Sequence, residues 1–231
     1  MPSDYRLHYA PDNASVIVRL VLLELGQEFD DVLVDRRQQA QQSPEYLKLN
    51  PAGLIPALET PAGPIFETGA ILLWLSEVHG AMAPAPGSKD RAAFLKWLFY
   101  VANTLHPNLR MHFYPAKYID SHQTELQSGC QANLTHSLEL LNDLAGSGQP
   151  WLNGTVPSIL DFYLAACLRW MALYTTQDKD WFTLTDWPNL HALCAKLENR
   201  PSVQSALYIE GYAAQPFTNP QPVTPPQGVA L

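Results

Sequence analysis

Short apolar runs alternate with helical patterns over the first 80 residues of the chain. Four runs are typical of β-strands and three of helices, in the order Arg6–Tyr9 (strand), Ser15–Leu25 (helix), Phe29–Val34 (strand), Ser43–Leu49 (helix), Ile55–Leu58 (strand), Pro64–Phe66 (strand) and Thr68–His79 (helix). Gly26 and Gly80 follow two of the helical runs, where glycine commonly ends a helix. This order predicts a small α/β domain over residues 1–80.

The pattern becomes almost wholly helical after an alanine- and proline-rich linker at residues 81–88. Apolar residues then recur every three or four positions in two series, Phe94, Leu98, Val101, Leu105, Leu109 and Leu126, Cys130, Leu134, Leu138, Leu141. Ser158–Tyr174 and Asn189–Leu197 add two helical patterns. We therefore predict an all-α bundle over residues 89–214. A tail follows at residues 215–231, whose five prolines favour an extended or disordered chain.

Composition narrows the function classes. Apolar residues make up 47% of the 231 residues, which is enough for a full core. The net charge of −8 disfavours a nucleic-acid partner, because phosphate binding needs clustered Lys and Arg. No apolar run is long enough for a membrane span, and the first residues do not resemble a signal peptide. The three cysteines are too few and too scattered for a disulfide framework, so we expect a cytoplasmic protein.

The first candidate ligand-binding site is at Ile55 and Pro56, at the start of a predicted strand. Proline removes one donor from the strand ladder, and a cis bond before it would turn the N–H and C=O of Ile55 towards a peptide-like ligand. A plain turn before an edge strand is the alternative interpretation. A second candidate is Glu67 with Thr68, where a helix N-terminus could hold a carboxylate and Glu67 an amino group. Simple helix capping by Thr68 is the alternative there.

The loop after the first predicted strand is a third candidate. A thiolate at the N-terminus of the following helix would be stabilised by free N–H groups and by hydroxyl or amide donors. Tyr9, Asn13 and Ser15 are the available donors, whereas Asp12 would oppose a thiolate unless its carboxylate points away. Helix capping alone is the other interpretation of these side chains.

These pieces, in this order and followed by a helical half, resemble the glutathione S-transferases over about residues 5–210. The family's NPxGxxPxL segment matches Asn50–Leu58. By that resemblance Pro56 is cis, and Ile55 pairs with the cysteinyl backbone of glutathione. The family's Glu-Ser/Thr pair, which holds the γ-glutamyl end, matches Glu67 and Thr68. The family's N-capping box matches Ser158–Asp161, which is a structural feature.

This resemblance implies a thioredoxin-like α/β N-terminal domain that binds glutathione, and an all-α C-terminal bundle that supplies the second-substrate pocket. The bacterial beta class is the most similar in two stretches. Its PGACS loop aligns with Pro11–Ser15, which places Ala14 where the class has its cysteine. Its WLNYIATELHK stretch aligns with Trp97–Pro107, which places the class histidine at His106. Without the cysteine, the sulfur chemistry has to come from the ligand, with Ser15 or Asn13 as the activating donor.

Family members hold the glycyl end of glutathione with Lys, His or Gln in the second helix. Gln41 and Gln42 match best, with three arginines as alternatives, Arg36, Arg37 and Arg110. The same glutamines could form a solvated stretch without a ligand. The second-substrate pocket is expected along residues 90–118, with a helix kink near Pro107. Its candidate residues share a helical spacing that is also found in helix cores, Tyr100, Asn103, His106, Arg110, Phe113 and Tyr114.

We therefore expect a cytoplasmic bacterial glutathione transferase that conjugates glutathione, as co-substrate, to a small hydrophobic electrophile in detoxification. No metal, nucleic acid or membrane partner is expected, and the family implies a homodimer. One alternative is a glutathione-dependent disulfide reductase or peroxidase that uses no protein cysteine. Another is a non-enzymatic binding module.

Overall fold

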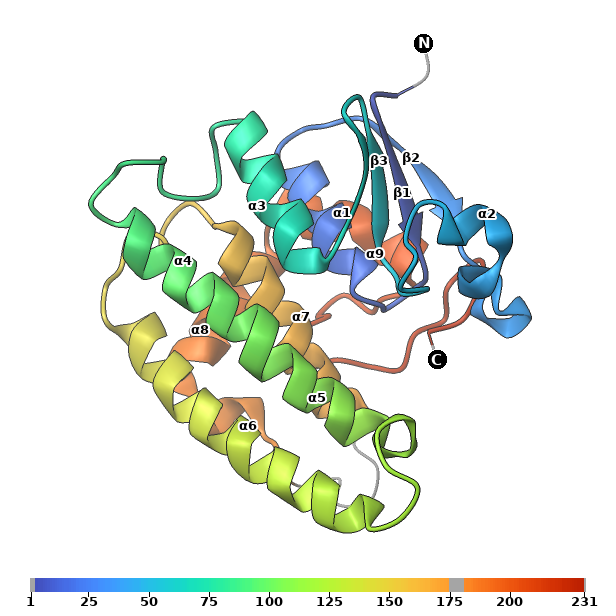
Figure 1. Ribbon diagram of the computed structural model, residues 1–231. Coiled ribbons are helices and arrows are strands. Elements are labelled where there is room, and N and C mark those ends of the chain that lie inside the picture. The colour runs from blue at the N-terminus through green and yellow to red at the C-terminus, as the bar shows by residue number, and fades with distance from the viewer. Residues whose placement is uncertain (1–2, 175–180, 231) are drawn as a thin grey trace.

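A mixed four-stranded sheet forms one half of the molecule (Figure 1). The computed structural model describes residues 3–174 and 181–230. The strand order is β2-β1-β3-β4, with bounds Phe29–Leu33, Tyr5–Tyr9, Ala57–Thr60 and Gly63–Phe66. β1 runs parallel to β2 and antiparallel to β3, and the β1–β3 register ends at the His8–Ala57 pair. The loop after β1 therefore lies beside the segment that leads into β3.

Helix α1 (Ser15–Glu24) lies at the centre of the molecule. Every residue from Ser15 to Leu22 is buried, which explains why apolar residues lie on all faces of the helix, with Arg19 as the one charged residue among them. The helix contacts the sheet and α3 (Thr68–Val78) in the first half, and α7 (Ile159–Leu173) in the second. One continuous apolar core consequently spans both halves.

The second half is helical. Its remaining helices are α4 (Arg91–Tyr100), α5 (His106–Phe113), α6 (Gln123–Gly146), α8 (Pro188–Glu198) and α9 (Pro201–Glu210). Short turns complete the described chain, η1 (Arg36–Gln38), η2 (Ala40–Gln42), helix α2 (Pro44–Leu47), η4 (Pro115–Lys117) and η5 (Leu184–Asp186). No described helix is long and apolar enough to cross a membrane.

A π-helical segment, Val101–Leu105, joins α4 to α5, so that they form one long rod beside α6 (Figure 1). The sequence predicts a kink near Pro107, but the irregularity lies one turn earlier. It leaves Pro107 in the first turn of α5, where a missing N–H costs little. The predicted capping box is confirmed, because Leu160 N–H donates to Ser158 Oγ and Ser158 N–H donates to Asp161.

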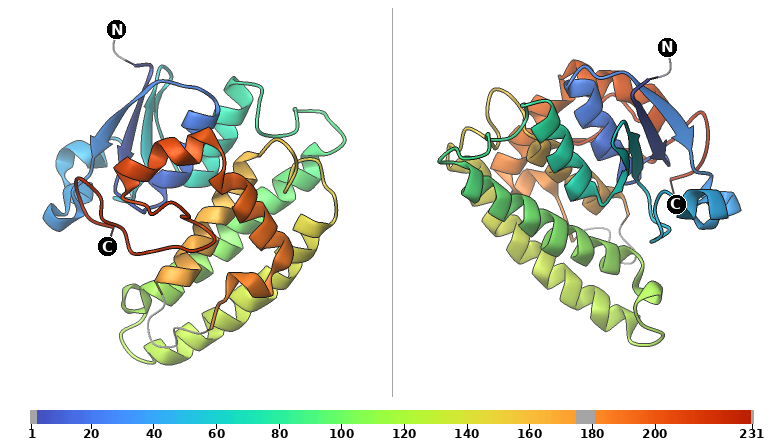
Figure 2. Two further views of the ribbon diagram at one scale, coloured as in Figure 1. Left: turned by 180° about the vertical axis from the view of Figure 1, so that it is seen from behind. Right: turned by 45° about the horizontal axis from the view of Figure 1, so that its top comes forward.

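Two parts of the chain differ from the sequence-based prediction. Helix α9 was not predicted, and the third strand begins two residues later, after the cis Ile55–Pro56 bond. The tail is extended, as expected, but the disordered alternative is wrong for residues 215–230. Phe217 is only 1% exposed, and the tail runs back along the first half (Figure 2). The proposed linker at 81–88 lies between α3 and α4.

Candidate functional site

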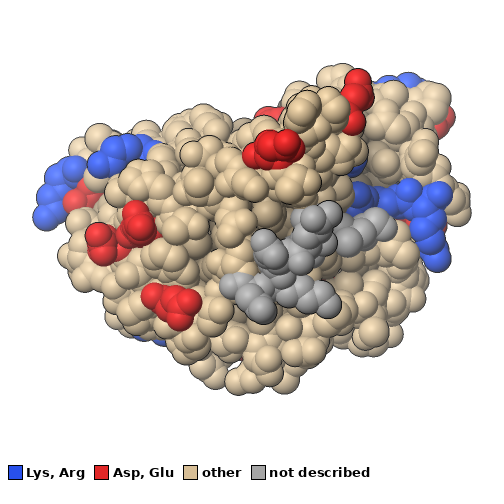
Figure 3. Space-filling model, turned by 90° about the horizontal axis from the view of Figure 1, so that it is seen from below, with Lys and Arg blue, Asp and Glu red and all other residues tan. Residues whose placement is uncertain are grey.

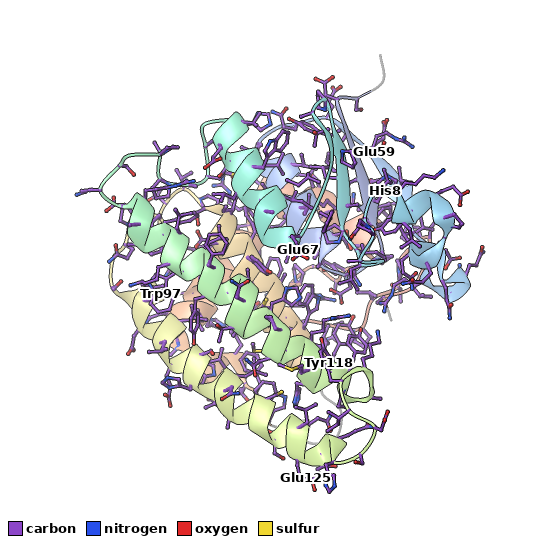
Figure 4. The ribbon with its side chains drawn as sticks, viewed as in Figure 1. His8, Glu59, Glu67, Trp97, Tyr118 and Glu125 are labelled. Carbon is purple, nitrogen blue, oxygen red and sulfur yellow. The ribbon has the colours of Figure 1, made fainter. Side chains whose placement is uncertain are left out.

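A cleft of about 590 Å³ lies between the sheet half and the helical half. It is lined by the loop after β1, the loop before β3, the start of α3, and residues of α5 and α7. Eleven of the fifteen predicted site residues line it, Asn13, Gln41, Gln42, Ile55, Pro56, Glu67, Thr68, His106, Arg110, Phe113 and Tyr114. Figure 4 labels Glu67 at one side of this space and Tyr118, which also lines it, beyond the end of α5.

The loop before β3 offers a backbone edge to the cleft. The Ile55–Pro56 bond is cis, and Ile55 lies outside the β1–β3 ladder. The preceding carbonyl of Leu54 is held by the Tyr46 hydroxyl at 2.6 Å and by Asn50 Nδ2 at 2.7 Å. These two bonds fix the loop, and a backbone edge of this kind can pair with an extended peptide ligand.

Glu67 and Thr68 form the next part of the cleft wall. Glu67 has φ +70°, in the left-handed region that is costly for a residue with a side chain. It is the N-cap residue of α3, and Thr68 is the first helical residue, so the expected cap position of Thr68 is wrong by one residue. The free N–H groups at this helix start suit a carboxylate, and the Glu67 carboxylate suits an ammonium group.

Asp12 lines the cleft next to Asn13, but its carboxylate is taken up by partners in the helical half. The carboxylate is fully buried and accepts hydrogen bonds from Arg169 Nε at 2.9 Å, Trp170 Nε1 at 3.0 Å and the Tyr212 hydroxyl at 2.8 Å. The Tyr174 hydroxyl also donates to it. Its negative charge is therefore compensated by the helical half, and a thiolate near the loop is not opposed directly.

Asn13 lines the cleft. Its Oδ1 accepts a hydrogen bond from the Ala14 N–H at 2.8 Å, and its amide NH₂ donates to no group among the described residues. Ser15 is different, because its hydroxyl donates to the Ala10 carbonyl at 3.0 Å and is completely buried. Ser15 does not line the cleft, and neither does Tyr9, which is 2% exposed beneath the Arg19 guanidinium. The hypothesis that Ser15 is the thiol donor is not supported by this placement.

Gln41, Gln42 and Arg36 line the end of the cleft nearest α2. Gln42 Nε2 donates to the Gly53 carbonyl at 3.2 Å and so supports the loop before β3. Gln41 Oε1 is buried and has no hydrogen-bond partner among the described residues. An unpaired buried acceptor costs about 1–3 kcal/mol, so a ligand N–H at this point would be favourable.

His106 lies deep in the cleft, on the first turn of α5. Its Nδ1 is 2.9 Å from the Tyr163 hydroxyl, and its ring lies against Trp170 at 5.5 Å between centroids. Burial lowers the pKa of His106 to about 4, and the nearby positive charge of Arg110 adds to this effect. The imidazole is therefore uncharged at pH 7, where it can form hydrogen bonds but cannot supply a positive charge.

The helical wall of the cleft is aromatic. Phe113 and Tyr114 line it as predicted, but Tyr163, Trp170 and Tyr174 of the α7 region were missed. The sequence signal of α7 is that of a core helix, since its residues Ile159 to Met171 are all buried. The spacing of these three aromatic residues is the same as that of residues packed only in the core, so the sequence did not show that they also line the cleft.

Tyr100 and Asn103 were predicted in this wall but do not line it. The Tyr100 hydroxyl is 3.0 Å from Ser137 Oγ, so that side chain lies against α6, and Asn103 is exposed. The π-helical turn is the physical reason. It widens the turn that contains Asn103 and follows Tyr100, so a spacing of three to four residues no longer places these two residues on the face of His106 and Arg110.

Three cationic side chains line the cleft, Arg36, Arg110 and Lys117. Burial lowers the pKa of Lys117, and the positive charges of Arg110 and Arg36 lower it further. None of the three forms an ion pair with a described carboxylate. Figure 3 shows Lys and Arg atoms in separate groups near the left and the right edge of the face seen from below. The cleft thus favours an anionic ligand although the whole chain is acidic.

None of the three cysteines lines the cleft. Cys130, Cys167 and Cys194 are buried in the helical half, and burial raises the pKa of each thiol. Within residues 3–174 and 181–230, no group of three His, Cys, Asp or Glu side chains is arranged to hold a metal ion.

Two family models match the chain. The model "Glutathione S-transferase, N-terminal domain" matches residues 4–77, and "Glutathione S-transferase, C-terminal domain" matches residues 123–196. The chain is 30% identical to the glutathione S-transferase GstA of Escherichia coli O157:H7, over 89% of this chain and 98% of that protein. It is 31% identical to the disulfide-bond oxidoreductase YfcG of Escherichia coli K12, over 87% of this chain and 93% of that protein.

Solved structures give the same picture of the fold. A bacterial beta-class glutathione S-transferase of Sphingomonas chungbukensis has a TM-score of 0.72 at 26% identity, over 89% of this chain and 98% of that one. A glutathione transferase of Burkholderia graminis, with two glutathione molecules bound per subunit, has a TM-score of 0.77 at 25% identity. That alignment covers 89% of this chain and 88% of the other.

Proposed function

The chain belongs to the glutathione S-transferase family, and from this premise we propose that it binds glutathione in the cleft and conjugates it to a small hydrophobic electrophile. The single observation that supports this most directly is the composition of the cleft. A peptide-binding edge, a helix N-terminus beside a carboxylate and an aromatic wall meet there, and no protein thiol does.

Glutathione would lie extended along the edge of the sheet half. The α-carboxylate of its γ-glutamyl residue would accept hydrogen bonds from the N–H groups at the start of α3, and the ammonium group would pair with Glu67. The cysteinyl backbone would pair with Ile55. The glycyl N–H and carboxylate would then reach Gln41 and Arg36, whose free acceptor and positive charge complement them.

In this pose the sulfur would face the loop after β1, because that loop lies beside the segment that leads into β3, which contains Ile55. The Asn13 amide and the N-terminus of α1 would stabilise its thiolate. A free thiol has a pKa of about 8.5. One hydrogen bond to a charged acceptor is worth about 1.5–3 kcal/mol, and about 1.4 kcal/mol corresponds to one pKa unit. Asn13 alone could therefore bring the thiol pKa close to neutrality.

The thiolate would attack an electrophile held against the aromatic wall. Phe113, Tyr114 and Trp170 supply apolar surface there, and neutral His106 with the Tyr163 hydroxyl can hydrogen-bond a polar group of the product. The proton lost from the thiol leaves to solvent, and the leaving group departs from the electrophile. No protein cysteine enters this scheme.

Calorimetric titration with glutathione tests the binding half of the proposal. Glu67→Gln should raise the Kd about tenfold, since a charged hydrogen bond to the ammonium group is lost. Glu59→Gln is the matched control, because Glu59 pairs with Arg6 and His8 away from the cleft (Figure 4). Absence of glutathione binding by the unaltered chain would sink the transferase proposal and favour a non-enzymatic binding module.

Reduction of a disulfide by two glutathiones is the second candidate function. The observation in its favour is that Arg110 and Lys117 lie in the helical part of the cleft, where a second anionic tripeptide could bind. Turnover of hydroxyethyl disulfide without turnover of chlorodinitrobenzene would support it, and the reverse would support conjugation. The cytoplasmic location, bacterial origin, homodimer and role in detoxification stay predictions.

A further inference from the structure

The proline-rich tail, residues 215–230, is anchored near its start by the carboxylate of Glu198, at the end of α8. The backbone N–H groups of Phe217 and Thr218 donate to Glu198 Oε1 at 2.8 and 2.7 Å, and the Thr218 hydroxyl donates to Oε2 at 2.8 Å. The Phe217 ring is buried in the main core. The tail is thus held firmly at its beginning, without a regular helix or strand.

Arg169, which also holds Asp12, fixes the next part of the tail. Its guanidinium donates to the Pro216 carbonyl at 2.7 Å and to the Gln221 carbonyl at 3.1 Å. The Thr224 N–H donates to the Gly211 carbonyl at 3.0 Å. Prolines limit the freedom of the unfolded tail, which lowers the entropic cost of holding it in this path.

The end of the tail crosses onto the sheet half (Figure 2), and its last described residue is part of the cleft lining. Gly228 has φ +76°, which is strained for any other residue, and a Cβ there would lie 2.8 Å from Leu33 Cδ1 and 3.2 Å from Pro11 Cδ, so a side chain would force its neighbours to shift. Arg36 Nη1 donates to the Ala230 carbonyl. Ala230 itself lines the cleft, with Arg36, at the same end as Gln41 and Gln42.

We propose that residues 228–230, here called the tail wall, close the glycyl end of the glutathione site and exclude thiols that extend beyond the glycyl carboxylate. The inference rests on the proposed function, because it uses the glutathione pose described above. Arg36 connects the tail wall to the ligand, because the guanidinium that would bind the glycyl carboxylate also donates to the Ala230 carbonyl. A longer ligand would have to displace the tail wall and break the bond from Arg36 to Ala230.

Two thiols of different length test this inference, glutathione and γ-Glu-Cys-Gly-Gly, which carries one more glycine and keeps the terminal carboxylate. Their Kd values are measured by calorimetry on the full chain, on a chain ending at Gln227, and on Gly228→Val. The full chain should prefer glutathione about tenfold or more, the range expected when one charged hydrogen bond is lost. Both altered chains should lose most of that preference.

Gln227→Ala is the matched control, since Gln227 is exposed and precedes the tail wall. It should keep the preference of the full chain. Circular dichroism and thermal unfolding verify that the altered chains fold, which is expected because the anchors at Phe217 and Glu198 remain. An equal preference in the full and shortened chains would overturn the tail wall while leaving glutathione binding intact. Failure of the full chain to bind either thiol would overturn the proposed function and this inference with it.

Discussion

Asn13 and Ser15 lie two positions apart, and the sequence treats both as possible thiol donors. The structure separates them, because the Ser15 hydroxyl donates to the Ala10 carbonyl away from the cleft, whereas Asn13 lines the cleft. Whether a side chain in a loop points inward or outward depends on which neighbour satisfies it. That choice is not encoded in residue type or spacing, so the sequence could identify the loop but not the donor.

His106 makes the stability of the fold depend on pH. Its pKa is about 4 in the folded chain, below the ordinary 6.5, because of burial and then the charge of Arg110. Between pH 4 and pH 6.5 His106 is protonated in the unfolded chain and neutral in the folded chain. The contribution of His106 is therefore fully present above pH 6.5 and is lost as the pH falls towards 4. The loss should be on the order of 3 kcal/mol.

Urea unfolding of the unaltered chain and of His106→Gln, measured across this pH range, checks the prediction. The variant should show a shallower fall in unfolding free energy than the unaltered chain. His136→Gln, on the exposed face of α6, is the control and should follow the unaltered chain. Parallel curves for His106→Gln and the unaltered chain would contradict the role given to His106.

At the scale of elements, the sequence predicts all four strands, the helices flanking the sheet and the helical repeats to within a few residues. Those patterns come from burial of one face or of a whole helix, and burial acts directly on residue type. The π-helical turn at Val101–Leu105 could not be predicted, because each of its residues is compatible with an α-helix. Its consequence is that Tyr100 and Asn103 turn away from the cleft.

The close approach of α3 to the π-helical turn yields a second prediction. A Cβ on Gly69 would lie 3.3 Å from the Ala102 Cβ, whereas a Cβ on Gly129 in α6 would meet nothing within 4 Å. Alanine in a helix is worth about 0.5–1 kcal/mol over glycine. Gly129→Ala should gain that amount in unfolding free energy. Gly69→Ala should gain less and should weaken glutathione binding, because it moves the start of α3.

Urea unfolding and calorimetry with glutathione measure both effects on the same two variants. Equal stabilisation by Gly69→Ala and Gly129→Ala, with unchanged glutathione Kd, would show that the contact at Ala102 does not position the site.

At the scale of the whole molecule, buried charges join the two halves. Asp12 contacts Arg169, and Glu210 accepts Arg19 Nε at 2.6 Å and the Asp12 N–H at 2.8 Å. These partners are far apart in sequence, and a charged residue in a helix or loop is normally a sign of exposure. These pairs of charged residues could therefore not be predicted from the sequence. The packing of α9 against α1 and the position of the tail at the cleft could not be predicted for the same reason.

Removing the Asp12 charge should destabilise the whole molecule. Asp12→Asn leaves Arg169 buried without its carboxylate, which typically costs about 3–5 kcal/mol. Glu77→Gln is the control, because its pair with Arg91 is partly exposed and is worth about 1 kcal/mol or less. Urea unfolding measures both values. Similar losses in the two variants would mean that the buried cluster does not hold the halves together.

The central claim is that the sulfur chemistry belongs to bound glutathione, whose thiolate is stabilised by Asn13 and not by Ser15 or a protein cysteine. The most direct test is the ultraviolet absorbance of the thiolate, titrated with pH as the difference between the chain with and without glutathione. The unaltered chain should give a thiol pKa at least one unit below the value of about 8.5 for a free thiol. Asn13→Ala should raise it by about one unit, and Asn13→Asp should raise it further. A bound thiol that titrates like free glutathione, or one that Asn13→Ala leaves unchanged, would contradict the account.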